Sequence, residues 1–263
     1  MSDWLYSQSE LGIFFFGLIG SVGLMYLMSF ALRRTSIIAE VSDHEKEFLI
    51  AIQSGLVALS AIVLSFSLVL VITNFERVDS NVASEASRIN DVDRLLQQYG
   101  DPSLNAIREN LKKYTTSILD DEWPMLKTKG EGVETGNLFV PISDAIGKIN
   151  PTTMRESVIF SEILKKMNEV MELRESRLES AHIGLHRIYW IVNFSILLGV
   201  LFMSAVALLL NRWLTAVGIT LELAALIGLM TIVFACDQPF KGAVSVKSDA
   251  ISDALKTIEA RQK

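Results

Sequence analysis

The stretch FLIAIQSGLVALSAIVLSFSLVLVIT, Phe48–Thr73, contains no charged residue over 26 positions. A helix of about 20 apolar residues is long enough to span the hydrocarbon layer of a bilayer, which is about 30 Å thick. Three further stretches meet the same criterion: Leu11–Leu32, Ile188–Leu210 and Leu214–Ala235. The sequence therefore predicts four transmembrane helices.

The first of these stretches is not typical of a cleaved signal peptide. Asp3 and Glu10 stand where a signal peptide carries basic residues. The apolar run is also longer than the apolar segment of such a peptide. We expect it to remain in the protein as a membrane anchor.

The composition excludes several classes of function. A single cysteine excludes an intrachain disulfide and a cysteine-based zinc site, and a net charge of −6 gives no basic footprint for nucleic acid. The chain contains no glycine-rich phosphate loop, no nucleophile at a fixed spacing from a base and no paired acid motif. We therefore expect neither an enzyme nor a bound cofactor.

Between the second and third stretches, residues 76–187 are rich in charged side chains, and their apolar residues recur at helical spacing. This spacing predicts two amphipathic helices. Their apolar faces consist of Leu104, Ile107, Leu111, Tyr114, Ile118 and Leu119, and of Phe160, Ile163, Leu164, Met167, Val170 and Met171. No alternation typical of strands is present. We expect an all-α fold with four transmembrane helices per subunit and a helical cytoplasmic domain inserted between the second and third.

These patterns divide the chain into a first transmembrane helix pair (1–75), the cytoplasmic domain (76–187), a second transmembrane pair (188–240) and a C-terminal cytoplasmic helix or tail (241–263). Asp101-Pro102-Ser103 and Asn150-Pro151-Thr152-Thr153 are typical helix starts. Between them, a loop is predicted by Gly130, Gly132, Gly136, Pro141 and Gly147. Between Thr152 and the third stretch, the only breaker is Gly184. We therefore expect one long helix that makes the domain continuous with the third transmembrane helix.

Lysine and arginine near the ends of the spans indicate orientation. One side carries Arg33, Arg34, Lys46 and Arg212, and the other carries Arg77, Arg88, Arg174, Arg177, Arg187, Lys241 and Lys247. The larger group predicts that the helical domain and both termini are cytoplasmic. The Arg33-Arg34 pair favours the opposite orientation, because it lies in a short loop, where the rule is strongest.

Polar residues recur every seven positions in and just after the second stretch, at Gln53, Ser60, Ser67 and Asn74. This spacing places them on one slowly drifting stripe of a helix. Serine and other small or polar residues let membrane helices pack closely and hydrogen-bond, so the pattern favours a packing stripe. A wetted pore face is the alternative.

Glu222 is the only ionisable residue within the fourth stretch. A charged group at the centre of a membrane helix costs about 2.5 to 3.5 kcal/mol. One interpretation is a protonated carboxyl that hydrogen-bonds a neighbour, because desolvation disfavours the charged form. The other is a proton or cation relay.

His182 and His186 are spaced one helical turn apart, and Glu179 precedes them by one turn. Metal ligands can have this spacing. Because no second anchoring motif is present, the pattern favours an interfacial hydrogen-bonding stripe instead. We therefore predict no metal site.

The fourth stretch is followed by CDQPFKG, Cys236–Gly242. Pro239 and Gly242 prevent simple continuation of the helix. Asp237 would then lie at the membrane interface and pair with Arg77, Arg187 or Lys241. This ion pair would hold the membrane layer and the cytoplasmic layer together at their boundary. A part in permeation is the alternative role for Asp237.

Several segments together resemble the bestrophin-like membrane family of bacteria. In the family's order they are Asn74-Phe75-Glu76-Arg77, Glu85-Ala86 with Ile89, Arg108 with Leu111 and Tyr114, Glu122-Trp123-Pro124, and Asp237-Gln238-Pro239-Phe240-Lys241-Gly242. They cover most of the chain, from the second stretch to the C-terminus. The resemblance implies an integral protein of the bacterial inner membrane.

The segments Val63-Leu64-Ser65-Phe66 and Leu70-Val71-Ile72-Thr73-Asn74 are similar to the stretch that lines the neck of the pentameric bestrophin anion channels. The similarity implies a homo-oligomer, a pentamer, with Ile62 and Phe66 at an apolar neck. It also implies pore-lining or packing roles for Ala58, Val69 and Thr73, and a membrane–cytoplasm boundary at Asn74, Arg77 and Asp237. Ala58 is smaller than the residue expected there, which widens that ring. No dense acidic run follows the fourth stretch, so we expect no calcium gating.

We expect a bestrophin-like ion channel that conducts anions such as chloride, with inorganic ions and membrane lipid as partners. Residues 76–187 contain 19 acidic and 15 basic residues, and their net charge of −4 repels anions unless the pore lining is neutral or basic. One alternative is a non-conducting membrane-anchored sensor or interaction protein. Another is a proton-coupled transporter that uses Glu222, although no span is broken by proline.

Overall fold

The second predicted span is part of a helix much longer than a bilayer requires. In the computed structural model, α3 runs from Asp43 to Tyr99, and its 57 residues correspond to a length of about 85 Å. No glycine or proline interrupts the sequence between Leu56 and Tyr99. α3 ends at Tyr99, and the next residue, Gly100, has a φ of 86°, in the left-handed region that favours glycine.

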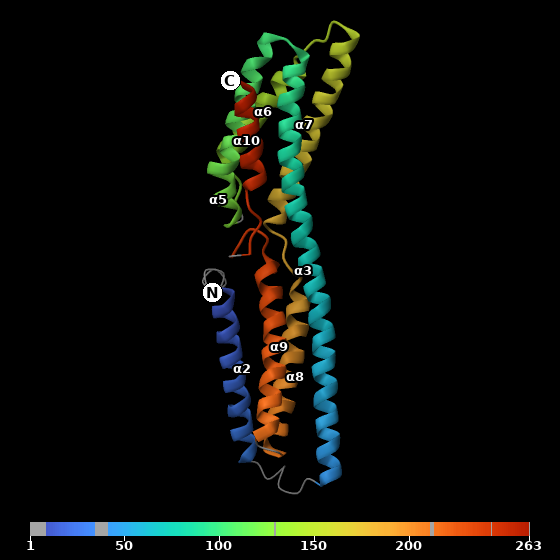
Figure 1. Cartoon of the computed structure of the whole chain (residues 1–263), viewed down its shortest axis with the longest axis vertical. Helices are drawn as coiled ribbons and strands as arrows, with labels where there is room; N and C mark the ends of the chain where they lie inside the picture. The colour runs from blue at the N-terminus through green and yellow to red at the C-terminus, as the bar shows by residue number, and fades with distance from the viewer. Residues whose placement is uncertain (1–8, 35–41, 129, 211–212, 243, 263) are drawn as a thin grey trace. The chain divides into compact units, whose positions relative to one another are not determined.

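The structure describes all residues except 1–8, 35–41, 129, 211–212, 243 and 263. The described residues form helices and no strand, which confirms the all-α prediction. Besides α3, the elements drawn in Figure 1 are α2 (Glu10–Arg33), the 3₁₀ turn η2 (Pro102–Leu104), α4 (Asn105–Ser117), the π-helical turn η3 (Ile118–Glu122), α5 (Trp123–Leu126), α6 (Val133–Gly147), α7 (Met154–Ser180), α8 (Arg187–Leu210), α9 (Trp213–Asp237) and α10 (Asp249–Gln262).

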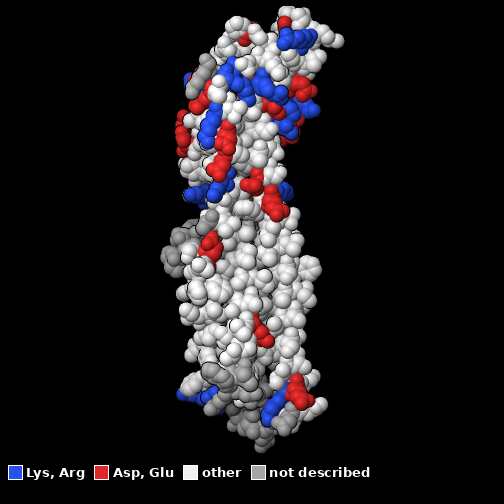
Figure 2. All heavy atoms as spheres, viewed as in Figure 1, with Lys and Arg blue, Asp and Glu red and all other residues white. Residues whose placement is uncertain are grey.

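The predicted number of spans is confirmed for the described residues. By length and composition, the helices able to cross a membrane are Glu10–Arg33, His44–Tyr99, Arg187–Leu209 and Thr215–Asp237. In Figure 2 the visible surface over their apolar stretches is nearly free of lysine, arginine, aspartate and glutamate, whereas these residues gather elsewhere on the chain. Arg212, used above to predict orientation, lies outside the described residues.

The helices form two compact units. The membrane unit contains α2, α8, α9 and the residues of α3 up to Asn74. The helical unit contains the residues of α3 from Phe75 onward, together with α4 to α7 and α10. The C-terminal helix α10 is not a separate tail, because Ile251, Ala254 and Ile258 are buried in the core of the helical unit.

In the membrane unit, α2 packs against α8 and α9, and α8 packs against α9. Small side chains allow close approach: Ser204 and Ala205 of α8 are buried, and a Cβ at Gly17 would lie 3.1 Å from Ile227 of α9. Lipid tails are as apolar as leucine, so membrane helices associate through close packing and polar contacts. α3 contributes Leu64 to the same core.

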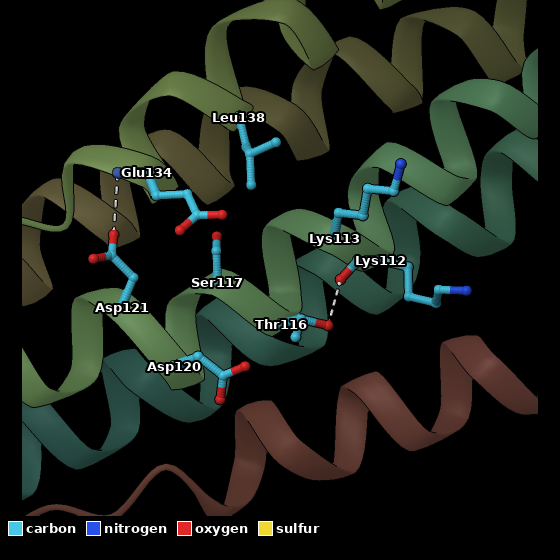
Figure 3. A pocket seen from close by; sticks show the side chains of 8 residues that line it. All are labelled: Lys112, Lys113, Thr116, Ser117, Asp120, Asp121, Glu134 and Leu138. Atoms are coloured by element: carbon cyan, nitrogen blue, oxygen red, sulfur yellow. Dashed lines mark hydrogen bonds between the residues drawn. The ribbon is translucent and has the colours of Figure 1, made fainter.

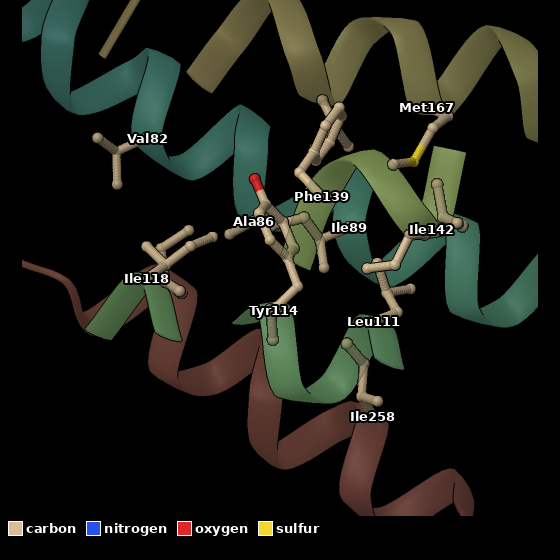
Figure 4. Close-up of a cluster of buried hydrophobic side chains, with 14 of the residues drawn as sticks. Val82, Ala86, Ile89, Leu111, Tyr114, Ile118, Phe139, Ile142, Met167 and Ile258 are labelled. Carbon is tan, nitrogen blue, oxygen red and sulfur yellow. The ribbon is translucent and has the colours of Figure 1, made fainter. Parts of the chain in front are cut away.

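The helical unit has an apolar core to which α3, α4, α6, α7 and α10 all contribute (Figure 4). At its centre the rings of Tyr114 and Phe139 lie 5.3 Å apart between centroids. Ile89, Leu111 and Ile142 are fully buried around them. Each such side chain contributes roughly 1.5 to 3 kcal/mol by leaving water. This burial explains why short helices such as α4 are stable.

The two predicted helix starts are confirmed. The side chain of Asp101 accepts a hydrogen bond from the backbone N of Ser103 at 2.8 Å, at the start of η2. Thr153 is the N-cap of α7 and forms a reciprocal capping box with Glu156. Hydrogen bonds from the backbone and side chain of Thr152, and from Thr153, lower the pKa of the Glu156 carboxyl.

The predicted loop between these helices is wrong, because residues 133–147 form α6 even though the helix contains Pro141. Its buried residues recur at helical spacing: Thr135, Phe139, Ile142 and Ile146. They pack α6 against α4. Burial of this face outweighs the missing backbone donor of the proline.

The prediction of one helix from Thr152 into the membrane is also wrong. α7 ends at Ser180 and α8 begins at Arg187. At the break, the backbone N of Leu185 donates a hydrogen bond to Asp237 Oδ1. A Cβ at Gly184 would overlap the Gln238 side chain. The end of α9 therefore packs closely against this connection, where the chain is not helical.

Candidate functional site

One face of α3 is exposed in the membrane unit. The exposed fractions of Ile62, Phe66 and Val69 are 54%, 67% and 61%, and Ala58 and Thr73 are exposed as well. The five residues recur at intervals of three or four, which places them on one side of the helix. The structure thus brings together the predicted neck residues and the three predicted pore-lining or packing residues; we call these five residues the α3 face.

Two apolar grooves meet at Phe66. One, of about 320 Å³, lies along α3 and is lined by Ala61, Ile62, Ser65, Phe66 and Val69. The other, of about 620 Å³, lies between α3 and α8 and is lined by Val63, Phe66, Val69, Leu70, Ile188, Tyr189 and Val192. Such a continuous apolar surface requires lipid or another protein to cover it.

The polar stripe of α3 is buried inside the membrane unit. Asn193 Nδ2 of α8 donates a hydrogen bond to Ser67 Oγ at 2.9 Å. Gln53 Nε2 lies 3.4 Å from Ser204 Oγ of the same helix. Ser60 is buried, and Asn74 is half-buried. The packing interpretation is therefore confirmed for Gln53 and Ser67, and this stripe does not share the exposed side of the α3 face.

Glu222 lies in α9 and is half-buried. Gln53 Nε2 donates a hydrogen bond to Glu222 Oε2 at 3.2 Å. The contact joins α9 to α3 and provides the hydrogen-bonded neighbour that the first interpretation of Glu222 requires. A relay role for this carboxyl stays a prediction.

The predicted boundary residues occupy different settings. α9 ends at Asp237, and Gly242 has a φ of 85°, which confirms the predicted end of the helix. Asp237 is buried, and its carboxylate accepts the hydrogen bond from Leu185 described above. Asn74 is half-buried within α3, and Arg77, three residues further along the helix, is exposed. The predicted ion pair of Asp237 stays a prediction.

His182 and His186 do not share a helical face, because both lie in the connection between α7 and α8. Both are exposed, and the backbone N of Ile188 donates a hydrogen bond to His186 Nδ1 at 3.3 Å. His186 therefore caps the start of α8. In the described ranges of the chain, no group of three histidine, cysteine, aspartate or glutamate residues is arranged to hold a metal ion.

The sequence analysis missed a buried ion-pair network in the helical unit. Arg177 of α7 lies between two carboxylates: its Nε is 2.7 Å from Glu85 Oε2, and its Nη2 is 2.6 Å from Glu122 Oε1. Arg174 Nε donates to Glu122 Oε2 at 3.1 Å. Glu85, Glu122 and Arg177 are fully buried. The network connects α3, η3 and α7.

The electrostatics of this network keep its arginine charged. Burial alone lowers the pKa of Arg177, but the attraction of Glu85, its hydrogen bonds and the attraction of Glu122 outweigh that effect and raise the pKa. The Arg177 guanidinium also lies 5.8 Å from the centroid of the Trp123 ring. Burial raises the pKa of the neighbouring Tyr114 hydroxyl, which is therefore neutral. Two arginines and two carboxylates give the network no net charge.

A second network joins the C-terminal helix to the same unit. Asp93 of α3 is fully buried, and its two carboxylate oxygens lie 2.9 Å from Arg108 Nε and 2.7 Å from Arg261 Nη1. Gln262 Nε2 donates to the backbone O of Arg108 at 3.1 Å. These contacts explain why α10 packs on α4.

A sequence signal for both networks exists in the helical spacing. The buried side of α3 comprises Val78, Val82, Glu85, Ile89, Val92, Asp93 and Leu96. The corresponding side of α7 comprises Ile163, Met167, Val170, Arg174 and Arg177. A charged residue at an apolar-face position of an amphipathic helix predicts a buried charge that needs a partner.

Comparisons with known proteins agree with this architecture. The model of a family described as having a bestrophin-like domain matches residues 19–251. A crystal structure of a mutant bacterial bestrophin homologue from Klebsiella pneumoniae is similar with a TM-score of 0.73 and 12% identity, over 94% of this chain and 99% of that one. A structure of such a homologue obtained by zinc phasing is similar with a TM-score of 0.71 and 12% identity, over 94% and 98%. No curated protein matches the sequence.

Proposed function

Because the chain belongs to the bestrophin-like family, we propose that it is a homo-oligomeric ion channel of the bacterial inner membrane. The chain is an integral membrane protein, and its described residues include four helices long and apolar enough to span a membrane. In the proposed channel, α3 of each subunit lines a central pore. The assembly is a pentamer, by analogy with the channels that the neck sequence resembles.

One observation carries the proposal: Ile62, Phe66 and Val69 of the α3 face are apolar and exposed, whereas the stripe of Gln53, Ser60 and Ser67 on the same helix is buried. Polar residues on a membrane helix are costly when they face lipid. Here Gln53 is hydrogen-bonded to Ser204 and Glu222, and Ser67 is hydrogen-bonded to Asn193, all within the subunit. The exposed apolar face of α3 is therefore available to other copies of the chain. In a ring of subunits around one axis, this face would contact the neighbouring copies and line the pore.

The proposed neck is formed by rings of Ile62 and Phe66. An apolar constriction controls conduction by dewetting, because an ion must lose water to pass. No charged residue lies on α3 between Phe48 and Thr73, so the neck offers no carboxylate to a cation. A neutral apolar neck favours the ion that loses water at the lower cost, and we propose chloride over sodium on that ground. The helical unit and both termini are proposed to be cytoplasmic.

Planar-bilayer recordings on the purified protein test this function. With asymmetric sodium chloride, currents are expected to reverse near the chloride equilibrium potential. Phe66→Ala removes the ring from the neck and is expected to raise the conductance. Phe16→Ala is the matched control, because Phe16 is 71% exposed but lies on α2; its currents should equal those of the wild type.

Each part of the proposal has its own contradicting result. Wild-type protein without current in any salt would favour a non-conducting sensor or interaction protein. Reversal near the sodium potential would overturn the chloride preference alone. Unchanged conductance and gating in Phe66→Ala would overturn the neck and leave the family assignment intact.

A further inference from the structure

A pocket of about 450 Å³ lies in the helical unit beside the π-helical turn η3. Its volume is in the range of small-molecule sites, about 300 to 1,000 Å³. The walls come from α4, η3 and the first half of α6, and they carry charges of both signs together with the hydroxyls of Thr116 and Ser117. Nothing in the proposed channel function uses this pocket.

The charges are separated along the pocket, as Figure 3 shows. Lys112 and Lys113 of α4 lie at one end, and Asp121 and Glu134 lie at the other. Asp120 follows Lys113 by seven residues along α4 and η3, which is a helical rise of about 10 Å. A single ligand in this pocket would therefore meet ammonium groups at one end and carboxylates at the other.

Several of these groups are available to a ligand. In the described part of the chain, the side chains of Lys113, Asp120 and Glu134 have no hydrogen-bond or ion-pair partner. Lys112 Nζ is paired with Glu109 Oε2 at 2.8 Å. The available groups include both signs of charge.

Asp121 is held in a fixed orientation. Its Oδ2 accepts hydrogen bonds from the backbone N of Glu134, and from the backbone N and hydroxyl of Thr135, at 3.1 to 3.3 Å. These bonds cap the start of α6, whose own N-cap residue, Gly132, has no side chain to do so. A carboxylate fixed in this way by one oxygen presents the other at a defined position, which is what a binding site requires.

We propose that this pocket binds a small zwitterion, such as an amino acid whose ammonium and carboxylate groups are separated by several carbons. The ammonium group would lie among Asp120, Asp121 and Glu134, and the carboxylate would lie at Lys112 and Lys113. A simple anion is disfavoured because it would also meet three carboxylates, and a simple cation because it would meet two lysines. Leu138 supplies an apolar wall for the carbon chain.

Binding at this pocket would affect the buried ion-pair network of Glu85, Glu122, Arg174 and Arg177. Asp121 lines the pocket, and the next residue, Glu122, binds Arg174 and Arg177. Asp121 and Glu122 belong to the same π-helical turn, η3, and such turns occur frequently at functional sites. A ligand that orders η3 therefore also acts on the contact between η3 and α7.

Isothermal titration calorimetry on the full-length protein in detergent tests the proposal, with 5-aminovalerate as the probe. Pentanoate and pentylamine are matched controls, because each has a similar chain length and only one of the two charges. We expect 5-aminovalerate to bind and both controls to bind at least about tenfold more weakly. L-alanine, whose charges are adjacent, should also bind more weakly.

Two pocket variants and two surface controls locate the site. Lys113→Gln and Glu134→Gln should each weaken 5-aminovalerate binding about threefold to tenfold, because these side chains are partly exposed to solvent. Lys165→Gln and Glu162→Gln are the controls, because both residues are exposed on α7 outside the pocket. Hydrogen exchange should show protection by the ligand in residues 112–138.

The proposal is overturned if 5-aminovalerate gives no binding heat up to millimolar concentrations, or if pentanoate or pentylamine binds equally well. It is also overturned if the control variants weaken binding as much as the pocket variants, or if the ligand protects no residue within 112–138. The measurement needs no ion current, so failure here leaves the proposed channel function unaffected, and absence of current leaves this proposal testable.

Discussion

Replacing Arg177 with methionine is expected to destabilise the helical unit more than any replacement of an exposed arginine. The substitution places a long apolar side chain at a position that is 0% exposed. It removes the guanidinium that lies 2.7 Å from Glu85 and 2.6 Å from Glu122. Glu122 keeps Arg174 as a partner, whereas Glu85 loses its charged partner in the core.

The expected magnitude follows from the burial of that carboxylate. Removing one member of a buried ion pair typically costs about 3 to 5 kcal/mol, because the remaining charge stays buried without compensation. A change of 1 kcal/mol shifts the melting temperature of a domain of this size by about 3 to 4 °C. Arg177→Met should therefore lower the melting temperature of the helical unit by roughly 10 to 20 °C.

Thermal unfolding of the purified protein, followed by near-ultraviolet circular dichroism, measures this shift. Arg155→Met is the matched control in the same helix, since Arg155 is exposed and its guanidinium donates a hydrogen bond to the backbone O of Gln98. Its effect should be within about 0.5 kcal/mol of zero. The double variant Arg177→Met, Glu85→Met removes both charges and should recover most of the lost stability.

The reasoning is refuted if Arg177→Met shifts the melting temperature no more than Arg155→Met does. That result would mean that Glu85 and Glu122 are solvated or neutral without Arg177. A double variant that is less stable than Arg177→Met would also contradict it, because the cost would then come from lost packing and not from a buried unpaired charge.

Three further predictions follow from local geometry. Gly132→Ala should destabilise the helical unit by roughly 1 to 3 kcal/mol in chemical denaturation. The reason is that the added Cβ would lie 2.8 Å from Cβ and 2.9 Å from Cα of Glu122. A variant as stable as the wild type would contradict the close packing of α6 on η3. Thr153→Ala removes the capping box of α7 and should cost about 1 kcal/mol, with faster hydrogen exchange confined to the first turn; unchanged exchange there would count against it. Glu222→Gln keeps a hydrogen-bonding group opposite Gln53 and should leave flux and its pH dependence unchanged; loss of that pH dependence would establish a proton relay.

The spans were predictable because hydrophobicity alone decides them. Phe48–Thr73 must lie in hydrocarbon whatever surrounds it, and the helix starts at Asp101 and Thr153 depend on residues within a few positions of each other. The continuation of α3 to Tyr99 was also implicit in the absence of glycine and proline. These are local features, and the sequence contains all the information that they need.

The missed features depend on residues far apart in the chain. At the break before α8, Leu185 hydrogen-bonds to Asp237, which lies 52 positions away. α6 forms around Pro141 because α4 offers a surface for Ile142, which outweighs local helix-breaking signals. The ion-pair network joins residues 92 positions apart, and a charged residue read alone is more often exposed than buried.

The α3 face illustrates both cases. The seven-residue repeat of Gln53, Ser60 and Ser67 predicted a packing stripe, and the hydrogen bonds of Gln53 and Ser67 confirm it. The opposite role of Ile62 and Phe66 came from a resemblance, and a single subunit shows only that they are exposed. The residues or lipids that cover Ile62 and Phe66 depend on the oligomeric assembly. The spacing of residues within one chain does not predict that assembly.

The most direct test of the central claim is a cryo-electron microscopy structure of the purified assembly in a lipid nanodisc. The account predicts several copies around one axis, with Ile62 and Phe66 of each α3 as the side chains nearest to that axis. A single subunit, or an assembly in which the α3 face contacts lipid and the axis is closed by other helices, would contradict it.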